Sequence, residues 1–297
     1  MTLSTLGTRL LVMDENKLKN LKIEEVAQNE ELKNISNFTL SRNVPEEKRL
    51  QNTDTITYIY DAQDFAEFRD NVNAGNNYAG KTIYLMDNID LTSVCSETVG
   101  TWTPIGHTTE FSGTFDGNYY TVSNLYINSG AYQYEGLFSK IGASGIIRNT
   151  ILSNVYVRNV FNNATIPGSA GAFAGIITGG KIINCGVDSG SIYCIKTIGN
   201  SGTAWKCQRV GGITGDLIGG EINSCYNKAY VEGRNVVQNY NSVYIGGIVG
   251  CNSGGPGKVY NCYNTGTVYA QAYFLAISGI VGDSLGLTSG RRNCKLL

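Results

Sequence analysis

The stretch "YIGGIVGCNSGGPGKVYNCYNTG" at residues 244–266 places a pair of glycines directly beside one of the most apolar short runs of the chain. Glycine weakens the interior of a strand, but it permits positive φ angles and close approach of two backbones. Bare glycines next to isoleucine and valine therefore predict a fold with tight corners, in which successive segments of the backbone lie close together.

The same pattern recurs along the chain. Close copies lie at residues 169–187 and 209–227, a weaker copy at 134–152 and a further copy at 276–294. The last glycines of the successive "GGIxG" units are 40, 35 and 32 residues apart: Gly175, Gly215, Gly250 and Gly282. A cysteine follows each unit in the same phase: Cys185, Cys225, Cys262 and Cys294. Self-similarity at this period is typical of a solenoid, in which each unit buries its apolar face against its neighbours.

Each repeat contains short apolar runs rather than helical patterns. Runs such as 245–249, 259–263 and 267–269 are rich in Ile, Val and Tyr and are bounded by Gly, Asn, Ser or Thr, as strands separated by turns are. Three runs in each unit predict one triangular coil, with equivalent strands of successive coils about 4.8 Å apart. The predicted fold class is all-β, a right-handed parallel β-helix (solenoid) with a short N-terminal helical capping segment.

The four cysteines in phase with the repeat are predicted to form an inward-facing structural ladder of free thiols. Identical positions on adjacent coils have parallel Cβ vectors, which is a poor geometry for a disulfide. A buried free cysteine behaves as a small hydrophobe. The asparagine that precedes most of these cysteines tolerates a left-handed corner and can form a side-chain ladder of its own.

An insertion lengthens the repeat that contains Cys194 and Cys207. We expect these two cysteines to come within bonding distance and, in an oxidising compartment, to close a short disulfide-bonded loop. That loop would carry Lys196, Trp205 and Lys206, and irregular insertions on solenoids tend to lie on one face. These three residues are therefore the predicted contact with a ligand or partner.

Composition divides the chain into two parts. Residues 1–54 hold one of the 37 glycines and many charged residues, which predicts a charged, partly helical segment and linker. Residues 55–297 are predicted to form the β-helix, with an N-terminal coil at about 55–130 and repeats at about 131–297, the last of them incomplete. The net charge of -1 gives no electrostatic field that would attract nucleic acid or an anionic membrane.

The sequence contains neither a transmembrane run nor a signal-peptide pattern, since the longest N-terminal apolar stretch is "LLVM" at residues 10–13. We therefore expect either a cytoplasmic protein or an internal piece of a longer exported one. In the second case the chain would be extracellular or at the cell surface.

Residues 57–127 carry the clearest resemblance to a known family. The segments "AQDFAEFRDNVNAG", "KTIYLMDNIDL" and "FSGTFDGN" resemble the start of bacterial surface β-helices with GLUG repeats, and the "GGIVG" units resemble the GLUG motif itself. The resemblance implies a secreted or cell-wall adhesin-like protein, with a host glycan or host protein as its partner. Such repeats also occur beside IgA-specific zinc metallopeptidases. This chain has one histidine, His107, so a two-histidine zinc motif is impossible and no metal or cofactor is predicted.

Enzymes with this architecture use converging carboxylates on neighbouring coils. The candidate carboxylates here are Glu110, Asp116, Glu135, Asp188, Asp216, Glu221, Glu232 and Asp283. Asp216 and Asp283 share one phase of the repeat, but Cys251 lies between them, so the pattern favours solvated corner residues. We therefore expect no catalytic site. His107, without a positioned partner, is predicted to be a surface residue.

The 19 tyrosines leave two interpretations open. Rows of tyrosine on an extended sheet suit sugar or protein binding, or they stabilise the sheet through cross-strand contacts. The sequence favours a non-catalytic binding or display module. The alternative is an accessory domain of a secreted hydrolase or peptidase, or a degenerate carbohydrate-active β-helix. Because the final repeat stops soon after Cys294, we also expect exposed strand edges and self-association through the C-terminal end.

Overall fold

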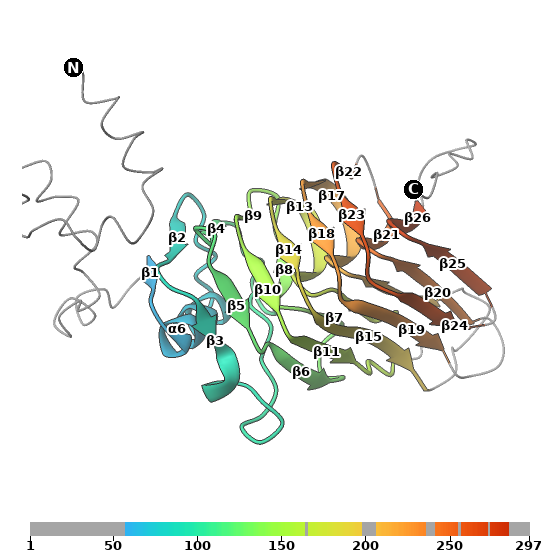
Figure 1. Cartoon of the computed structure of the whole chain (residues 1–297), viewed down its shortest axis with the longest axis horizontal. Coiled ribbons are helices and arrows are strands. Elements are labelled where there is room, and N and C mark those ends of the chain that lie inside the picture. The colour runs from blue at the N-terminus through green and yellow to red at the C-terminus, as the bar shows by residue number, and fades with distance from the viewer. Residues whose placement is uncertain are drawn as a thin grey trace, which may run out of the picture. The chain divides into compact units, whose positions relative to one another are not determined.

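The computed structural model describes residues 57–163, 166–197, 206–235, 241–254, 257–272 and 274–284. The chain divides into two units, Met1–Asp54 and Thr55–Leu297, and the described residues belong to the second. Their strands wind into a parallel β-helix (Figure 1), which confirms the predicted fold class. The charged segment predicted for residues 1–54 lies outside the described residues.

The strands form four parallel sheets, named I to IV here. Sheet I contains β1 (Tyr58–Ile59), β2 (Thr82–Leu85), β4 (Thr114–Asp116), β8 (Phe138–Ile141), β9 (Ile146–Arg148), β13 (Ala174–Ile183), β17 (Thr214–Asn223), β21 (Val249–Asn252), β22 (Lys258–Tyr260) and β26 (Val281–Ser284). Sheet II contains β3 (Ile89–Asp90), β5 (Thr121–Ser123), β10 (Ile151–Ser153), β14 (Gly186–Val187), β18 (Tyr226–Asn227) and β23 (Tyr263–Asn264).

The other two sheets have five strands each. Sheet III contains β6 (Tyr126–Ser129), β11 (Val155–Asn159), β15 (Gly190–Lys196), β19 (Tyr230–Asn235) and β24 (Val268–Gln271). Sheet IV contains β7 (Tyr134–Glu135), β12 (Ser169–Ala170), β16 (Lys206–Gly211), β20 (Asn241–Gly246) and β25 (Phe274–Ser278). A coil therefore has four sides, as in β13, β14, β15 and β16, and the predicted triangular coil is wrong. The run predicted at 245–249 is in fact divided, because β20 ends at Gly246 and β21 begins at Val249.

A helix covers the N-terminal end of the core, at the blue end of the solenoid in Figure 1. This helix, α6 (Ala62–Asn73), begins at Asp61, whose carboxylate accepts hydrogen bonds of 3.0 Å from the amides two and three residues later. Its buried face carries Phe65 and Phe68, and the Phe65 ring lies 5.6 Å from the ring of Trp102. The predicted helical cap is therefore present, and it covers the first coil with aromatic side chains. The short 3-10 helix η1 (Leu91–Ser93) follows β3.

The glycine pairs leave room for a buried or half-buried asparagine side chain. A Cβ atom on Gly212 would lie 2.4 Å from Cγ of Asn227, and one on Gly247 would lie 2.3 Å from Cγ of Asn264. These two asparagines form an internal ladder, since Nδ2 of Asn227 donates to Oδ1 of Asn264 at 2.8 Å. The third glycine of the motif lies against the preceding coil, because a Cβ on Gly215 would lie 2.6 Å from the Ala170 nitrogen. The bare glycines are thus sites of close packing.

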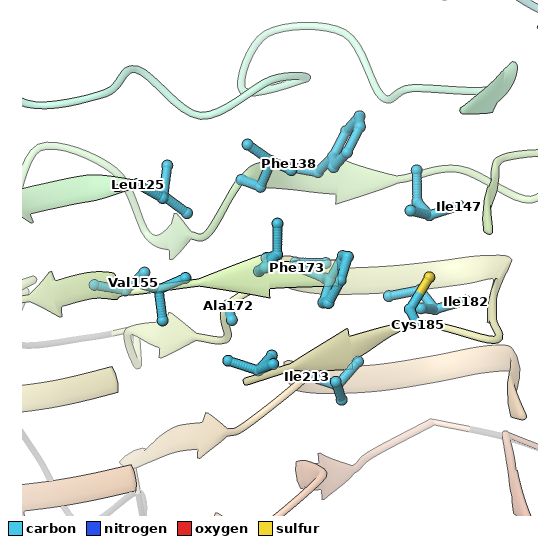
Figure 2. Packing of buried hydrophobic residues seen from close by; sticks show 14 of the residues in the cluster. Leu125, Phe138, Ile147, Val155, Ala172, Phe173, Ile182, Cys185 and Ile213 are labelled. Atoms are coloured by element: carbon cyan, nitrogen blue, oxygen red, sulfur yellow. The ribbon is translucent and has the colours of Figure 1, made fainter. Parts of the chain in front are cut away.

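Equivalent apolar residues of successive coils stack in the core. Phe138 donates its backbone amide to Phe173 on the next coil, and Phe173 donates to Ile213 on the one after. Figure 2 shows these three side chains in adjacent layers, with Ile147 and Ile182 on neighbouring strands. Stacking of like residues is what allows each thin coil to bury its apolar face.

Asparagines occupy left-handed corners between sheets I and II, as predicted. Asn149, Asn184 and Asn261 have φ angles of 52°, 53° and 55°. The side chains of the first two form a ladder, since Nδ2 of Asn184 donates to Oδ1 of Asn149 at 2.9 Å. Asparagine adopts this backbone region at lower cost than most residues, which explains its recurrence at the corner.

The cysteines that follow these corners are free thiols where the structure describes them. Cys185 and Cys225 are buried, and Cys262 is half-buried. Hydrogen bonding to Cys185, together with burial, raises the pKa of the Cys225 thiol. Cys294, the fourth member of the predicted ladder, lies outside the described residues.

We expect the Cys225→Ser variant to lower the free energy of unfolding by about 1 kcal/mol. A buried hydroxyl without a partner would cost more, about 1 to 3 kcal/mol. Here, however, Sγ lies 3.2 Å from the Asn223 carbonyl oxygen and 3.5 Å from that of Ile182, so a serine hydroxyl finds an acceptor. Urea denaturation followed by circular dichroism measures the difference, and a loss above about 3 kcal/mol would contradict this packing.

Apolar side chains are exposed on the last described strand of sheet IV. Leu275 is 48% exposed and Ile277 is 51% exposed, whereas Val243 and Ile245, their partners on β20, are buried. Within the described residues, β24, β25 and β26 have a paired neighbour on one side only. Self-association through this end stays a prediction.

Candidate binding surface

Tyrosines gather on the outer face of sheet III, whose strands β6, β11, β15, β19 and β24 lie side by side in Figure 1. The strand register aligns Tyr126 with Tyr156, Tyr156 with Ser191, and Ser191 with Tyr230. A second outward row runs beside the first: Asn128, Arg158, Tyr193, Glu232 and Tyr269. Tyr193 therefore lies beside the one position of the first row that has serine instead of tyrosine.

The four rings of Tyr126, Tyr156, Tyr193 and Tyr230 form a continuous column, called the tyrosine strip here. Ring centroids lie 5.3 Å apart between Tyr126 and Tyr156, with planes only 13° apart. Both later steps of the column measure 5.9 Å, with tilts of 54° and 57°. The first two rings stack face to face and so present their edges and hydroxyl groups outward, whereas the two later rings are tilted.

Polar side chains of the second row connect to the strip. Asn128 donates from Nδ2 to the Tyr126 hydroxyl at 3.3 Å and accepts at Oδ1 from Arg158 at 3.0 Å. The Tyr230 hydroxyl donates to Glu232 at 2.6 Å. Burial, and then the Glu232 carboxylate, raise the pKa of Tyr230 to about 12, so its hydroxyl remains a hydrogen-bond donor at neutral pH.

A hollow of about 190 Å³ lies at the N-terminal end of the strip, beside η1 and the corner between sheets II and III. Its lining includes Thr92, Ser96, Glu97, Asn124, Tyr126 and Tyr156. The amides form a column, in which Nδ2 of Asn154 donates to Oδ1 of Asn124 at 2.6 Å and Asn124 donates to Asp90 at 2.7 Å. Burial raises the pKa of Tyr156, and the charge of Glu97 contributes in the same direction.

A second tyrosine pair lies on sheet II, away from the strip. Tyr226 and Tyr263 stack at 5.3 Å with planes 11° apart, nearly the geometry of Tyr126 and Tyr156. Asp188 accepts from the Tyr226 hydroxyl at 3.0 Å and pairs with Lys228 at 2.7 Å. This pair has the same aromatic stacking without the long column, and it serves as an internal control for the strip.

The contact predicted around the insertion is not supported at Lys196. Lys196 is fully buried at the end of β15, and its Nζ donates to the Asn163 carbonyl oxygen at 2.7 Å. The prediction of Lys196 as an exposed contact with a ligand or partner is therefore wrong. It follows the inward alternation of Ile192 and Cys194 along the strand. Trp205 and the side chain of Lys206 lie outside the described residues, so those two contacts stay predictions.

The predicted disulfide is not formed in this structure. Cys194 is a buried free thiol that donates to Oε1 of Gln208 at 3.1 Å, and burial raises its pKa to about 12. The Cys207 side chain lies outside the described residues. Oxidation of this pair in solution therefore stays a prediction.

Most of the candidate carboxylates have cationic partners close to them. The ion pairs are Asp116 with Arg148 at 2.8 Å, Asp188 with Lys228 at 2.7 Å, Glu221 with Lys181 at 3.5 Å, Asp216 with Arg209, and Glu232 with Arg234. The register also aligns Asp216 with Cys251 and Cys251 with Asp283, as the repeat phase predicts. Glu110 accepts from the Thr178 hydroxyl at 3.1 Å. Three of these ion pairs join adjacent coils, whereas the pairs of Asp216 and Glu232 lie within one coil. Asp216 is fully buried, so its prediction as a solvated corner residue is wrong.

His107 stacks on Tyr132, with ring centroids 4.6 Å apart. Burial, and then the charge of Lys140, lower its pKa, so the imidazole is mainly neutral at neutral pH. Among the residues that the structure describes, no group of three His, Cys, Asp or Glu side chains is placed to hold a metal ion.

The sequence indicated rows of tyrosine on an extended sheet but did not single out the four members of the strip, Tyr126, Tyr156, Tyr193 and Tyr230. Their spacings of 30, 37 and 37 residues match the repeat period and were a usable signal. The spacing could not show that Tyr193 lies two residues beyond the position aligned with Tyr156. That position depends on the register between β11 and β15.

The comparisons with known proteins agree with this architecture. Residues 241–269, which run from β20 through β24, match the family model described as "The GLUG motif". The resemblance drawn from the sequence is therefore confirmed, and the described fold is a parallel β-helix that carries a GLUG motif.

Two relatives share parts of this sequence. A "Putative Gly-rich membrane protein" of Evansella cellulosilytica is 35% identical over 120 residues, which cover 38% of this chain and 13% of that protein. "Halomucin" of Haloquadratum walsbyi is 39% identical over 70 residues, covering 21% of this chain and 1% of that protein. The matched region thus spans only a small part of each relative.

Among solved structures, that of a "putative immunoglobulin A1 protease" from Bacteroides ovatus is similar with a TM-score of 0.40 and 16% identity, covering 76% of this chain and 84% of that one. In the part of the chain that the structure describes, no helix is long and apolar enough to span a membrane.

Proposed function

We propose that this chain is a non-catalytic binding and display module, adhesin-like and extracellular or at a cell surface, which binds an extended glycan along the tyrosine strip. The observation that carries the proposal is the strip itself. Four tyrosine rings form one column across four coils, and the side chains of Asn128 and Arg158 lie beside it. A linear polymer lying along the helix axis would meet these groups in succession.

The chemistry of the two rows favours a glycan over a protein partner. The rows contain tyrosine, serine, asparagine, arginine and glutamate, and none of their residues is aliphatic. The buried centre of a protein interface is about 65% apolar, with aromatic residues and arginine enriched and most other charged residues depleted. Tyrosine edges with hydroxyls, next to amide and guanidinium groups, suit the alternating C–H and O–H groups of sugars.

The absence of catalysis is supported by the arrangement of the carboxylates. Asp116, Asp188 and Glu232 each lie in an ion pair with a basic residue. A retaining glycosidase needs two carboxyl groups about 5 to 5.5 Å apart, and an inverting one needs about 6.5 to 9.5 Å with space for water. The relatives also favour a surface role, since one is named a membrane protein and the other Halomucin.

A glycan array tests the proposal with the full chain, the Tyr193→Ala variant and the Tyr263→Ala variant. Tyr193 connects the two halves of the strip, so its loss should weaken binding by about fivefold to tenfold, the effect of losing about 1 kcal/mol or slightly more. Tyr263 is the matched control, because it belongs to the stacked pair on sheet II.

Binding of the wild type to at least one glycan, reduced by Tyr193→Ala and unchanged by Tyr263→Ala, is the expected result. Equal binding by all three proteins, or binding to no glycan, would overturn the proposal. Release of reducing ends from the bound polysaccharide would favour instead a carbohydrate-active enzyme.

A further inference from the structure

The hollow beside η1 differs from the rest of the strip because it is concave and closed on one side by a loop. The loop at residues 94–101 returns on itself, with Ser96 and Gly100 exchanging backbone hydrogen bonds of 2.8 and 2.9 Å. The side chain of Ser96 also accepts from the Val99 amide at 3.0 Å. The loop, held in place by its own hydrogen bonds, therefore forms one wall of the hollow beside the Tyr126 ring.

The base of the hollow is held by hydrogen bonds that join three successive layers. The Tyr126 amide donates to Sγ of the buried Cys95 at 3.4 Å, and that thiol donates to the Asn124 carbonyl oxygen at 3.7 Å. The amide column from Asp90 through Asn124 ends at Asn154, because the register that pairs Val155 with Gly190 aligns Asn154 with Ser189 on the next coil. The last amide of the column therefore has no further amide on the next coil to bond with, and it lines the hollow.

The volume and the lining match a single sugar ring. At about 190 Å³ the hollow is smaller than pockets for drug-sized ligands, which measure about 300 to 1,000 Å³. Hydroxyl groups come from Thr92, Ser96 and Tyr156, an amide from Asn154, and ring surface from Tyr126. Hydroxyls and amides both donate and accept, which is what the vicinal hydroxyls of a pyranose require.

The charged side chains in and around the hollow favour an uncharged sugar over an anionic one. Glu97 is the ionisable acid of the lining, and no lysine, arginine or histidine lines the hollow. Of the cations outside the lining, Arg69 pairs with Asp70 at 2.7 Å and lies over the Trp102 ring, whereas Arg158 belongs to the outward row beside the strip and donates to Asn128. An anionic sugar inside the hollow would therefore meet the Glu97 carboxylate with no cationic side chain in the lining.

We infer that the hollow is a subsite for one uncharged pyranose residue of the glycan that lies along the tyrosine strip. The inference rests on the proposed function and deepens it, since it names the sugar class at one end of the strip. A chain that enters the hollow would continue over Tyr126 and Tyr156 toward Tyr193.

Isothermal titration tests the subsite with three probes: cellotetraose and chitotetraose, which are uncharged, and tetragalacturonic acid, which is anionic. The Thr92→Trp variant fills the hollow from its exposed rim. Thr98→Trp is the matched control, because Thr98 is an exposed threonine of the adjoining loop that does not line the hollow. Melting temperatures of both variants confirm that they fold.

We expect an uncharged probe to bind the wild type, Thr92→Trp to weaken it at least tenfold, and Thr98→Trp to keep it within twofold. Tetragalacturonic acid should not bind the wild type, and the exposed Glu97→Lys substitution should allow it to bind. This charge variant keeps the test decisive if Thr92→Trp fails to fold.

The outcomes separate the subsite from the strip. Full binding by Thr92→Trp, with loss in Tyr193→Ala, would overturn the subsite and leave the strip in place. Loss in Thr92→Trp without loss in Tyr193→Ala would support the hollow and overturn the strip. Preference of the wild type for tetragalacturonic acid would overturn the assignment of an uncharged sugar, and binding of none of the three probes would overturn the subsite.

Discussion

Replacing Gly212 with alanine is expected to lower the free energy of unfolding by about 3 kcal/mol or more. A Cβ at this position would lie 2.2 Å from the Gly247 carbonyl oxygen on the next coil and 2.4 Å from Cγ of Asn227. Asn227 is fully buried and donates to the Ala229 carbonyl oxygen at 3.0 Å, so it cannot move aside without losing that bond. The added methyl group would therefore force two coils apart.

Gly219→Ala is the matched control for this prediction. The nearest atoms to a Cβ on Gly219 lie at 3.8 and 3.9 Å, an ordinary van der Waals contact. Its effect should stay within about 0.5 kcal/mol, as for most surface substitutions. Urea denaturation followed by circular dichroism measures both variants. If Gly212→Ala were as stable as Gly219→Ala, the glycine pair would not be the site of close packing between coils.

The second large effect concerns Glu135, an acid buried in β7 inside the β-helix. It is fully buried, and neither carboxylate oxygen has a hydrogen-bond partner of good geometry. Burial raises its pKa from 4.5 to about 8, while the nearby Ser129 hydroxyl and Tyr132 amide oppose the shift. The folded protein therefore holds this carboxyl in its neutral form at pH 7.

Because burial raises the pKa of Glu135 in the folded state, the free energy of unfolding falls as the pH rises. The stabilising effect of the neutral carboxyl is fully present below pH 4.5 and is lost as the pH rises toward about 8, because the unfolded chain releases its proton first. At about 1.4 kcal/mol for each pH unit, the free energy of unfolding should fall by roughly 3 to 5 kcal/mol across this window. The Glu135→Gln variant keeps a neutral side chain of the same shape, so it should lack this decline.

Urea denaturation between pH 4 and pH 9 measures the effect. We expect Glu135→Gln to match the wild type near pH 4 and to be more stable at pH 9. Glu67→Gln, at an exposed position of α6, should keep the pH dependence of the wild type. Parallel pH profiles for the wild type and Glu135→Gln would show that the carboxyl is solvated.

The repeat pattern was sufficient to predict the solenoid, because its glycines and asparagines are required by the backbone itself. Gly212 leaves room for a buried asparagine, and Asn184 adopts a left-handed corner. The number of sides of each coil could not be predicted from the repeat pattern in the same way. The apolar run at 245–249 looks like one strand, but the chain turns at Gly247 and Ile248 and enters a different sheet.

The candidate site was harder to predict, because it depends on which residues of adjacent coils are neighbours. Lys196 looked like a loop residue, since a fully buried lysine is rare, yet the alternation of β15 directs it inward. Tyr193 completes the strip because the register places Ser191 opposite Tyr156 and Tyr230, and Tyr193 lies two residues further along β15.

NMR of the tyrosine rings shows whether a glycan contacts the tyrosine strip. The full chain, labelled with ¹³C at the tyrosine rings, is titrated with a glycan that binds on the array. We predict chemical-shift changes at Tyr126, Tyr156, Tyr193 and Tyr230, with the Tyr226 and Tyr263 rings unchanged. Shifts confined to the pair on sheet II, or saturating binding with no change at any ring of the strip, would contradict the account.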